Sequence, residues 1–162
     1  MVRPLDFGYD GRDIFIMADL YHNRVLELAA NIPNLGTLSA CDASVEKVSR
    51  VCGSSVRVDI ALSQDGQSIA AIAVNPQACA LGQAATAILS EHAVSASIDE
   101  VRQARNDLND MLKKGAEPPQ GRFWELRHLA GVRDYPPRHA STMLAFDAAV
   151  SAIAKACEAT SA

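Results

Sequence analysis

Hydrophobic positions change their spacing along the chain, and each spacing predicts a different element. In the first part of the chain, Tyr21, Val25 and Leu28 follow one another at intervals of three or four residues, which is typical of an amphipathic helix. Pro33 follows this segment and disfavours its continuation as a helix. We therefore expect a first helix over about 13–31.

A strand pattern follows the first helix. Apolar and polar side chains alternate over 55–62, which predicts a strand with one buried face. The pair Asp65-Gly66 comes next and is typical of a hairpin turn, because glycine readily adopts a positive φ. The apolar run 69–74 is then the returning strand, and a further strand is expected over 36–40. The predicted sheet has three antiparallel strands within about 36–74.

Helical spacing returns near residue 79 and continues to about 159. Within this part, Ser97 and Glu100 have the spacing of a capping box, so a helix is expected to begin there. An order of helix, sheet and then further helices is typical of an α+β domain. We predict a single domain over 1–162, in which a small three-stranded antiparallel sheet packs against about five helices.

The composition is that of a globular chain, and the distribution of its charged residues bears on whether it binds nucleic acid. Hydrophobic residues make up 49% of the chain and charged residues 21%, with a formal net charge of -4. Lys and Arg form no continuous stripe, so nucleic acid is not an expected partner. We expect no secretory signal and no membrane span. A cytoplasmic location follows, where the four cysteines would be free or metal-bound rather than paired.

Three residues are candidates for a metal or sulfur site. Cys79 falls at a predicted helix start, where unpaired N–H groups and the helix macrodipole favour the thiolate. Cys52 precedes Gly53, and a thiol on a turn is often presented at a site. His139 follows Pro137 at the start of the last predicted helix. Zinc accepts mixed sulfur and nitrogen ligands, so these two thiols and the imidazole form a candidate zinc site with an open fourth position.

Each of the three residues also has a plainer explanation, as a core cysteine, a surface thiol or an exposed histidine. Cys157 lies on the apolar face of the last predicted helix and is expected in the core. Cys41 is expected at a strand edge, and the less favoured alternative is that it supplies the fourth ligand of the candidate metal site. His22, His92 and His128 show no ligand spacing and are expected at the surface. No G-x-S-x-G, P-loop or G-x-G-x-x-G motif is present, so a serine hydrolase or a nucleotide site is not expected.

Several fragments occur in a characteristic order between about 20 and 156. They are Leu20-Tyr21-His22-Asn23-Arg24, Asn31-Ile32-Pro33-Asn34-Leu35-Gly36, Cys52-Gly53, Ala78-Cys79-Ala80-Leu81-Gly82-Gln83-Ala84, Leu129-Ala130-Gly131-Val132-Arg133-Asp134-Tyr135-Pro136-Pro137 and His139-Ala140-Ser141-Thr142-Met143-Leu144. In this order they resemble the iron–sulfur cluster assembly scaffold family, of the IscU and NifU N-terminal type. The segment 106–137 looks like the insertion of its SufU branch.

The resemblance implies a site built from three cysteines and an aspartate. Cys52 and Cys79 match two of those cysteines, whereas Ser54 stands at the position of the aspartate and Ala140 at that of the third cysteine. His139 matches the lysine or histidine that precedes the third cysteine. The resemblance thus implies two thiolates and one imidazole as ligands of iron, of a labile iron–sulfur cluster or, alternatively, of zinc. Water or a further cysteine would be the fourth ligand.

Three functions follow from this resemblance, and none is that of a classical enzyme. The first is a cluster-assembly scaffold that binds metal through Cys52, Cys79 and His139. The second is a sulfur acceptor that relays sulfur from a cysteine desulfurase. The third is a degenerate scaffold that only binds another protein. The partners implied by the resemblance are a cysteine desulfurase and recipient apo-proteins.

Overall fold

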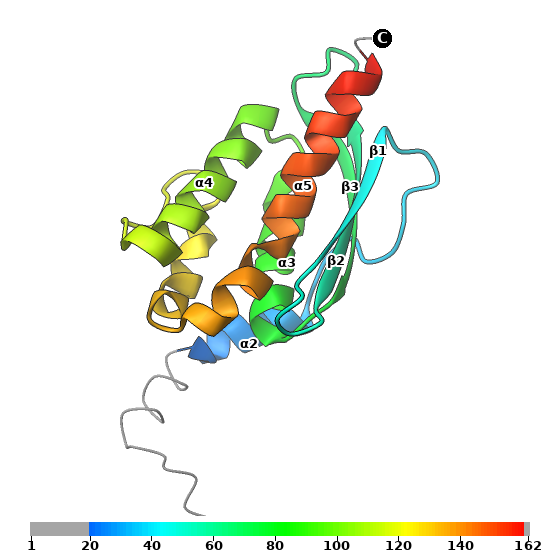
Figure 1. The fold of residues 1–162 in the computed structure, drawn as a ribbon. Coiled ribbons are helices and arrows are strands. Elements are labelled where there is room, and N and C mark those ends of the chain that lie inside the picture. The colour runs from blue at the N-terminus through cyan, green and yellow to red at the C-terminus, as the bar shows by residue number, and fades with distance from the viewer. Residues whose placement is uncertain (1–19, 161–162) are drawn as a thin grey trace, which may run out of the picture.

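The computed structural model describes residues 20–160 and shows a small sheet with helices packed on one face (Figure 1). In chain order the elements are α2 (Asn23–Ala30), β1 (Ala43–Val48), β2 (Ser55–Leu62), β3 (Ile69–Gln77), α3 (Ala80–Ala93), α4 (Ile98–Lys114), the 3-10 helices η1 (Trp124–Asp134) and η2 (Pro136–Arg138), and α5 (His139–Thr160). The predicted α+β class and the three-stranded antiparallel sheet are confirmed.

The helix α5 lies at the centre of the molecule, between the sheet and α4 (Figure 1). The strands lie in the order β1-β2-β3, and α5 crosses β1 and β2 while α3 packs on β3. On the other side of α5 lies α4, and α2 packs on α3. The hydrophobic core around α5 contains Phe146, Ile153 and Val58, all fully buried. Burial of these large apolar side chains is the main stabilising contribution to such a fold.

The segment Pro136–Ala159 is long and apolar enough to cross a membrane by length and composition. The sequence predicts no membrane span, and length and composition alone do not show one. In this fold, α5 contacts β1, β2, α3 and α4, so other elements of the same domain cover its apolar side chains. An apolar helix surrounded by packing partners is the usual central helix of a globular domain.

The first strand lies later in the chain than predicted. Residues 36–40 form no strand; only Leu35 makes an isolated parallel bridge, to Val74 on the edge strand β3. Gly36 has a φ of +122°, which turns the chain out of the ladder after this bridge. The segment then runs to β2, where the N–H of Leu38 donates to the buried carboxylate of Asp59. Local alternation could not reveal that this segment crosses the sheet.

The first predicted helix is interrupted at Tyr21 and His22, between helical Leu20 and Asn23. Residues 13–19 of the expected helix 13–31 lie outside the described part of the chain. Within it, α2 begins only at Asn23, because His22 has an extended backbone with φ -64° and ψ 165°. The His22 side chain makes a hydrogen bond with the carbonyl of His128, 2.9 Å away. A contact with a distant segment thus interrupts a helical pattern that continues in the sequence.

The local signals of the other elements are confirmed. β2 and β3 pair as a hairpin, and Gly66 in the turn has a φ of +71°. Ser97 and Glu100 form both hydrogen bonds of a capping box at the start of α4, and Gly115 closes that helix in the left-handed conformation. These signals are reliable because each depends on a few neighbouring residues only.

Candidate functional site

A cavity of about 440 Å³ lies where the β1–β2 turn, the start of α3 and the start of α5 meet. In Figure 1 these three segments come together at the lower end of the molecule. The side chains that line the cavity include Cys52, Ser54, Cys79, Gln83 and Arg138. We call it the dithiol cavity. The fold thus brings together two of the three predicted site residues, which lie far apart in the sequence.

Cys79 occupies the N-cap of α3, as predicted from the sequence. Its thiol is half-buried and donates to the hydroxyl of Ser141 on α5, with 3.6 Å between sulfur and oxygen. Gly82 permits this close approach of the two helices. A Cβ at Gly82 would lie 2.8 Å from the Cβ of Ala78 and 3.1 Å from the carbonyl oxygen of Ser141. Glycine at this position therefore holds the start of α5 against the cysteine.

Cys52 is exposed in the β1–β2 turn, and its surroundings favour the thiolate. Its sulfur lies 3.1 Å from the hydroxyl oxygen of Ser54, which can donate to the sulfur once the thiol has ionised. This hydrogen bond is the main reason why the pKa of Cys52 is lowered to about 7, and the hydroxyl of Ser49 and the charge of Arg138 act in the same direction. The Ser49 hydroxyl is buried and makes no regular hydrogen bond with the described residues.

His139 does not point into the dithiol cavity. Its Nε2 lies 2.9 Å from the carbonyl oxygen of Val132 and 3.1 Å from that of Arg133, both in η1. The histidine lines a different cavity, and the neighbouring Arg138 lines the dithiol cavity in its place. Side-chain direction at a helix start depends on such tertiary contacts, which the sequence pattern does not contain.

The remaining cysteines lie away from the two thiols. Cys41 is exposed and precedes β1, whereas Cys52 follows it, so the length of the strand separates them. Cys157 is half-buried and packs against the hydrophobic core, as expected. Among residues 20–160, no three Cys, His, Asp or Glu side chains are grouped so as to hold a metal ion. The structure therefore assembles two thiols and an arginine, without a third protein donor in place.

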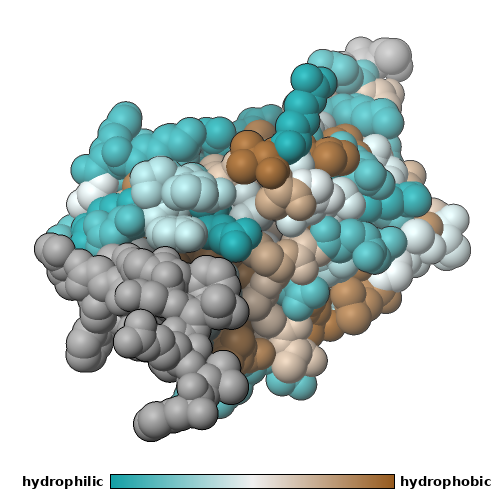
Figure 2. Space-filling view, turned by 60° about the horizontal axis from the view of Figure 1, so that its bottom comes forward, coloured by the Kyte–Doolittle hydropathy of each residue, from teal (hydrophilic) through white to brown (hydrophobic). Residues whose placement is uncertain are grey.

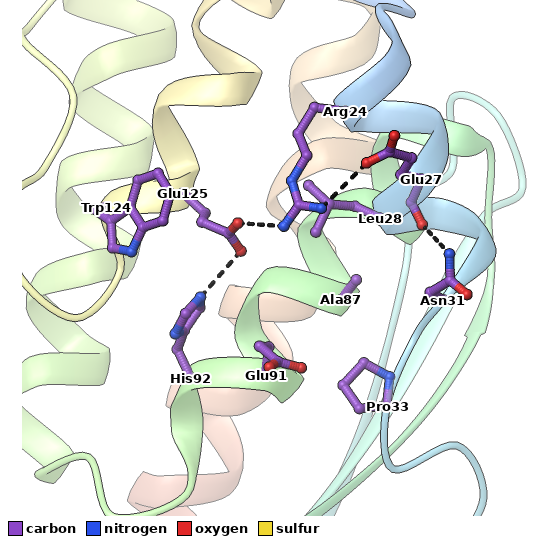
Figure 3. Close-up of a pocket in the computed structure, with 10 residues that line it drawn as sticks. All are labelled: Arg24, Glu27, Leu28, Asn31, Pro33, Ala87, Glu91, His92, Trp124 and Glu125. Carbon is purple, nitrogen blue, oxygen red and sulfur yellow. Dashed lines mark hydrogen bonds and ion pairs between the residues drawn. The ribbon is translucent and has the colours of Figure 1, made fainter.

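Sequence reasoning missed a second polar cluster, in a cavity of about 430 Å³ between α2, α3 and η1 (Figure 3). Glu125 is only 4% exposed and accepts hydrogen bonds from Arg24 and from His92, whose Nε2 is 3.1 Å away. Burial alone would raise the pKa of Glu125, but the hydrogen bonds with Arg24 and His92 outweigh it and keep the pKa below its ordinary value. His92, predicted at the surface, is in fact half-buried in this cluster.

The two other histidines expected at the surface are also half-buried. The rings of His22 and His128 meet edge to face, with 5.9 Å between their centroids. Burial lowers the pKa of His128, which favours its neutral form. No sequence motif marks the Glu125 cluster or the His22–His128 pair, because each joins residues from separate parts of the chain.

Comparisons with known proteins agree on one family. A family model described as the NifU-like N terminal domain matches residues 20–156. The chain is 37% identical to the N-terminal part of a nitrogen-fixing NifU-like protein from Brucella abortus, with a TM-score of 0.85 over 88% of this chain and 98% of that one. A search of curated proteins returned no match.

A second solved structure supports the fold. It is that of a candidate iron–sulfur cluster assembly scaffold protein for the SUF system from Fervidobacterium islandicum AW-1. The identity is 18% and the TM-score 0.76, over 84% of this chain and 98% of that one. At this identity the likeness bears on the fold alone.

Proposed function

Because the chain belongs to the family of NifU-like N-terminal domains, we propose that it takes part in iron–sulfur cluster assembly and holds its cargo at Cys52 and Cys79. The observation that carries this proposal is the dithiol cavity, where both cysteines line one solvent-open space. Thiolates are the usual protein ligands of iron–sulfur clusters and also bind zinc. On this view the cargo is iron or a labile cluster, and zinc is the alternative.

The ligand set within the cavity is incomplete, and this favours transient binding. Serine replaces the family's aspartate at Ser54, and alanine replaces its third cysteine at Ala140. His139 would join the two thiols only after its Nε2 leaves the carbonyls of Val132 and Arg133. We propose that cargo bound here has exchangeable positions, which donors from outside the cavity fill. A recipient apo-protein could then take up the cargo by ligand exchange.

The test is a measurement of iron, zinc and acid-labile sulfide per chain in protein purified without oxygen. Iron with sulfide, or zinc, is expected in the wild type and lost in Cys52→Ser and Cys79→Ser, because each change removes a thiolate ligand. Cys41→Ser is the matched control and should retain the metal. His139→Ala shows whether the imidazole joins the ligands. A metal-free wild type would contradict the proposal and favour a degenerate scaffold that only binds another protein.

A second candidate function is sulfur acceptance, and the environment of Cys52 favours it. At a pKa of about 7, a large share of this thiol is ionised at neutral pH, and the thiolate is the nucleophile in sulfur transfer. In the proposed step, the Cys52 thiolate attacks the terminal sulfane sulfur of a donor cysteine persulfide. A new S–S bond forms at Cys52, the donor's S–S bond breaks, and the donor cysteine leaves as a thiolate. The donor would be a cysteine desulfurase.

Mass spectrometry after incubation with a desulfurase and cysteine tests this step. An added mass of about 32 Da, one sulfur atom, is expected on the peptide that contains Cys52. It should disappear in Cys52→Ser and remain in Cys41→Ser. An unmodified Cys52 in a reaction where the desulfurase itself carries persulfide would reject the sulfur-acceptor function.

A further inference from the structure

A cavity of about 520 Å³ shares the β1–β2 turn with the dithiol cavity and is lined by basic side chains. Lys47 and Arg50 come from the end of β1 and its turn, and Arg105 and Lys113 come from α4. We call this cavity the basic groove. Val51 lines the groove and the next residue, Cys52, lines the dithiol cavity, so one turn contributes to both.

The charge of the basic groove is opposite to that of the chain. Four of the 15 Lys and Arg residues line it, but only one of the 19 Asp and Glu residues, Asp147. Asp147 pairs with Arg105, with 2.9 Å between oxygen and nitrogen. Among residues 20–160, no carboxylate pairs with Lys47, Arg50 or Lys113. Three cations thus gather without a counter-ion on a chain whose net charge is -4.

The groove also offers apolar surface. Met143 and Leu144 of α5 are among its lining residues and are nearly buried. Val48 and Val51 stand at its edge with 57% and 76% of their surface exposed. Figure 2 brings the lower end of Figure 1 forward and shows hydrophobic and hydrophilic residues side by side on that face. Exposed valines beside unpaired cations indicate a surface for a ligand that is both acidic and apolar.

We propose that the basic groove docks an acidic peptide segment of a partner protein that carries aliphatic side chains. Its carboxylates would pair with Lys47, Arg50 and Lys113, and its aliphatic side chains would cover Val48 and Val51. A nucleic acid shares the negative charge but has no aliphatic side chains to place on the valines. The docked segment would lie beside the turn that carries Cys52. The proposal does not depend on metal binding at the two thiols.

Fluorescence anisotropy with a short labelled peptide of glutamates and interspersed leucines tests the proposal on the full chain. Saturable binding is expected, and it should weaken as salt is raised, because surface charges are screened. Lys113→Glu should weaken binding by at least about fivefold, the range for loss of a surface ion pair together with new repulsion. Lys114→Glu is the matched control: it changes the same charge on the adjacent residue, which does not line the groove, and should alter binding by less than about twofold.

Several outcomes would overturn the proposal. The first is no saturable binding of the peptide. The second is equal weakening by Lys113→Glu and Lys114→Glu, which would mean attraction to the overall charge. The third is unchanged binding when the leucines are replaced by serines, or equal binding of a single-stranded oligonucleotide, since either would mean a general anion surface. Circular dichroism of both variants shows whether they fold as the wild type does.

Discussion

At the scale of single residues, Ser54 is the main cause of the lowered pKa of Cys52 in the dithiol cavity. An aspartate at this position would place a negative charge beside Cys52 and disfavour a second negative charge on the sulfur. Serine carries no charge, and its hydroxyl can donate to the thiolate at the observed 3.1 Å separation. The hydroxyl of Ser54 thus coincides with a pKa of Cys52 that is lowered to about 7. The proposed sulfur acceptance at Cys52 rests on this lowered pKa.

Replacing this hydroxyl should make Cys52 less reactive. In Ser54→Ala the pKa of Cys52 is expected to rise from about 7 towards the ordinary value of 9.0, because the main hydrogen bond to the thiolate is lost. A rise of about one unit lowers the thiolate fraction at pH 7 roughly fivefold. The rate of iodoacetamide labelling of the Cys52 peptide, followed by mass spectrometry across pH, measures the change.

Ser55→Ala is the control for this prediction, since it removes the adjacent hydroxyl in β2 without touching the thiol's hydrogen bond. Labelling of Cys52 in this variant should follow the wild-type pH profile. An unchanged profile in Ser54→Ala as well would show that this hydroxyl does not set the pKa.

At the scale of elements, Glu125 connects three helices that the chain places far apart. Its carboxylate is held between Arg24 of α2 and His92 of α3, and it projects from η1 (Figure 3). Loss of one partner in a buried ion cluster leaves the charges of the others uncompensated. This lowers the free energy of unfolding more than loss of a surface ion pair does. The packing of α2 and η1 against α3 therefore depends on a charge as well as on apolar contacts.

Glu125→Gln should destabilise the fold at neutral pH by about 2 kcal/mol, the range for a hydrogen bond to a charged group. The lowered pKa of Glu125 means that its contribution is fully present above its unfolded-state pKa of 4.5 and is lost as pH falls from there through the lower folded-state pKa. Urea unfolding at a series of pH values measures both effects. The stability difference between wild type and Glu125→Gln should shrink under acid conditions.

Glu91→Gln is the matched control, because Glu91 lines the same cavity but is exposed. It should change the free energy of unfolding by less than about 0.5 kcal/mol. Equal effects of the two substitutions, or a Glu125 effect that does not depend on pH, would contradict the role of this ion cluster.

At the scale of the whole molecule, the sheet separates thiols that the sequence leaves equivalent. β1 has six residues, and the strand alone extends about 20 Å at about 3.3 Å per residue. Cys41 lies before its first residue and Cys52 after its last, so the two thiols are at opposite ends of the sheet. The hypothesis that Cys41 supplies the fourth ligand is therefore not compatible with this architecture.

A bifunctional thiol reagent should report this arrangement directly. Dibromobimane fluoresces strongly once it bridges two thiols, and bridging is expected between Cys52 and Cys79, which line the same cavity. The signal should be lost in Cys52→Ser and in Cys79→Ser and retained in Cys41→Ser. A bridged peptide pair that contains Cys41 in the folded protein would contradict the described sheet.

The sequence by itself determined the elements whose signals are local. The β2–β3 hairpin at Gly66, the capping box of Ser97 and the N-cap position of Cys79 each depend on a few adjacent residues. The order of the motif fragments also indicated the family, because an ordered set of fragments is rarely met by chance. Cys52 and Cys79 were predicted as candidate site residues from their positions at a turn and at a helix start, and the motif fragments agreed with that prediction.

The tertiary structure alone decided which of these residues meet and what surrounds them. His139 turns to the carbonyls of η1, Arg138 takes its place at the thiols, and Glu125 gathers its partners from α2 and α3. The start of α2 directly after His22 likewise coincides with a contact between His22 and His128. The contacts of His22 with His128 and of Arg24 with Glu125 join residues about 100 positions apart, and no local pattern contains their free energy.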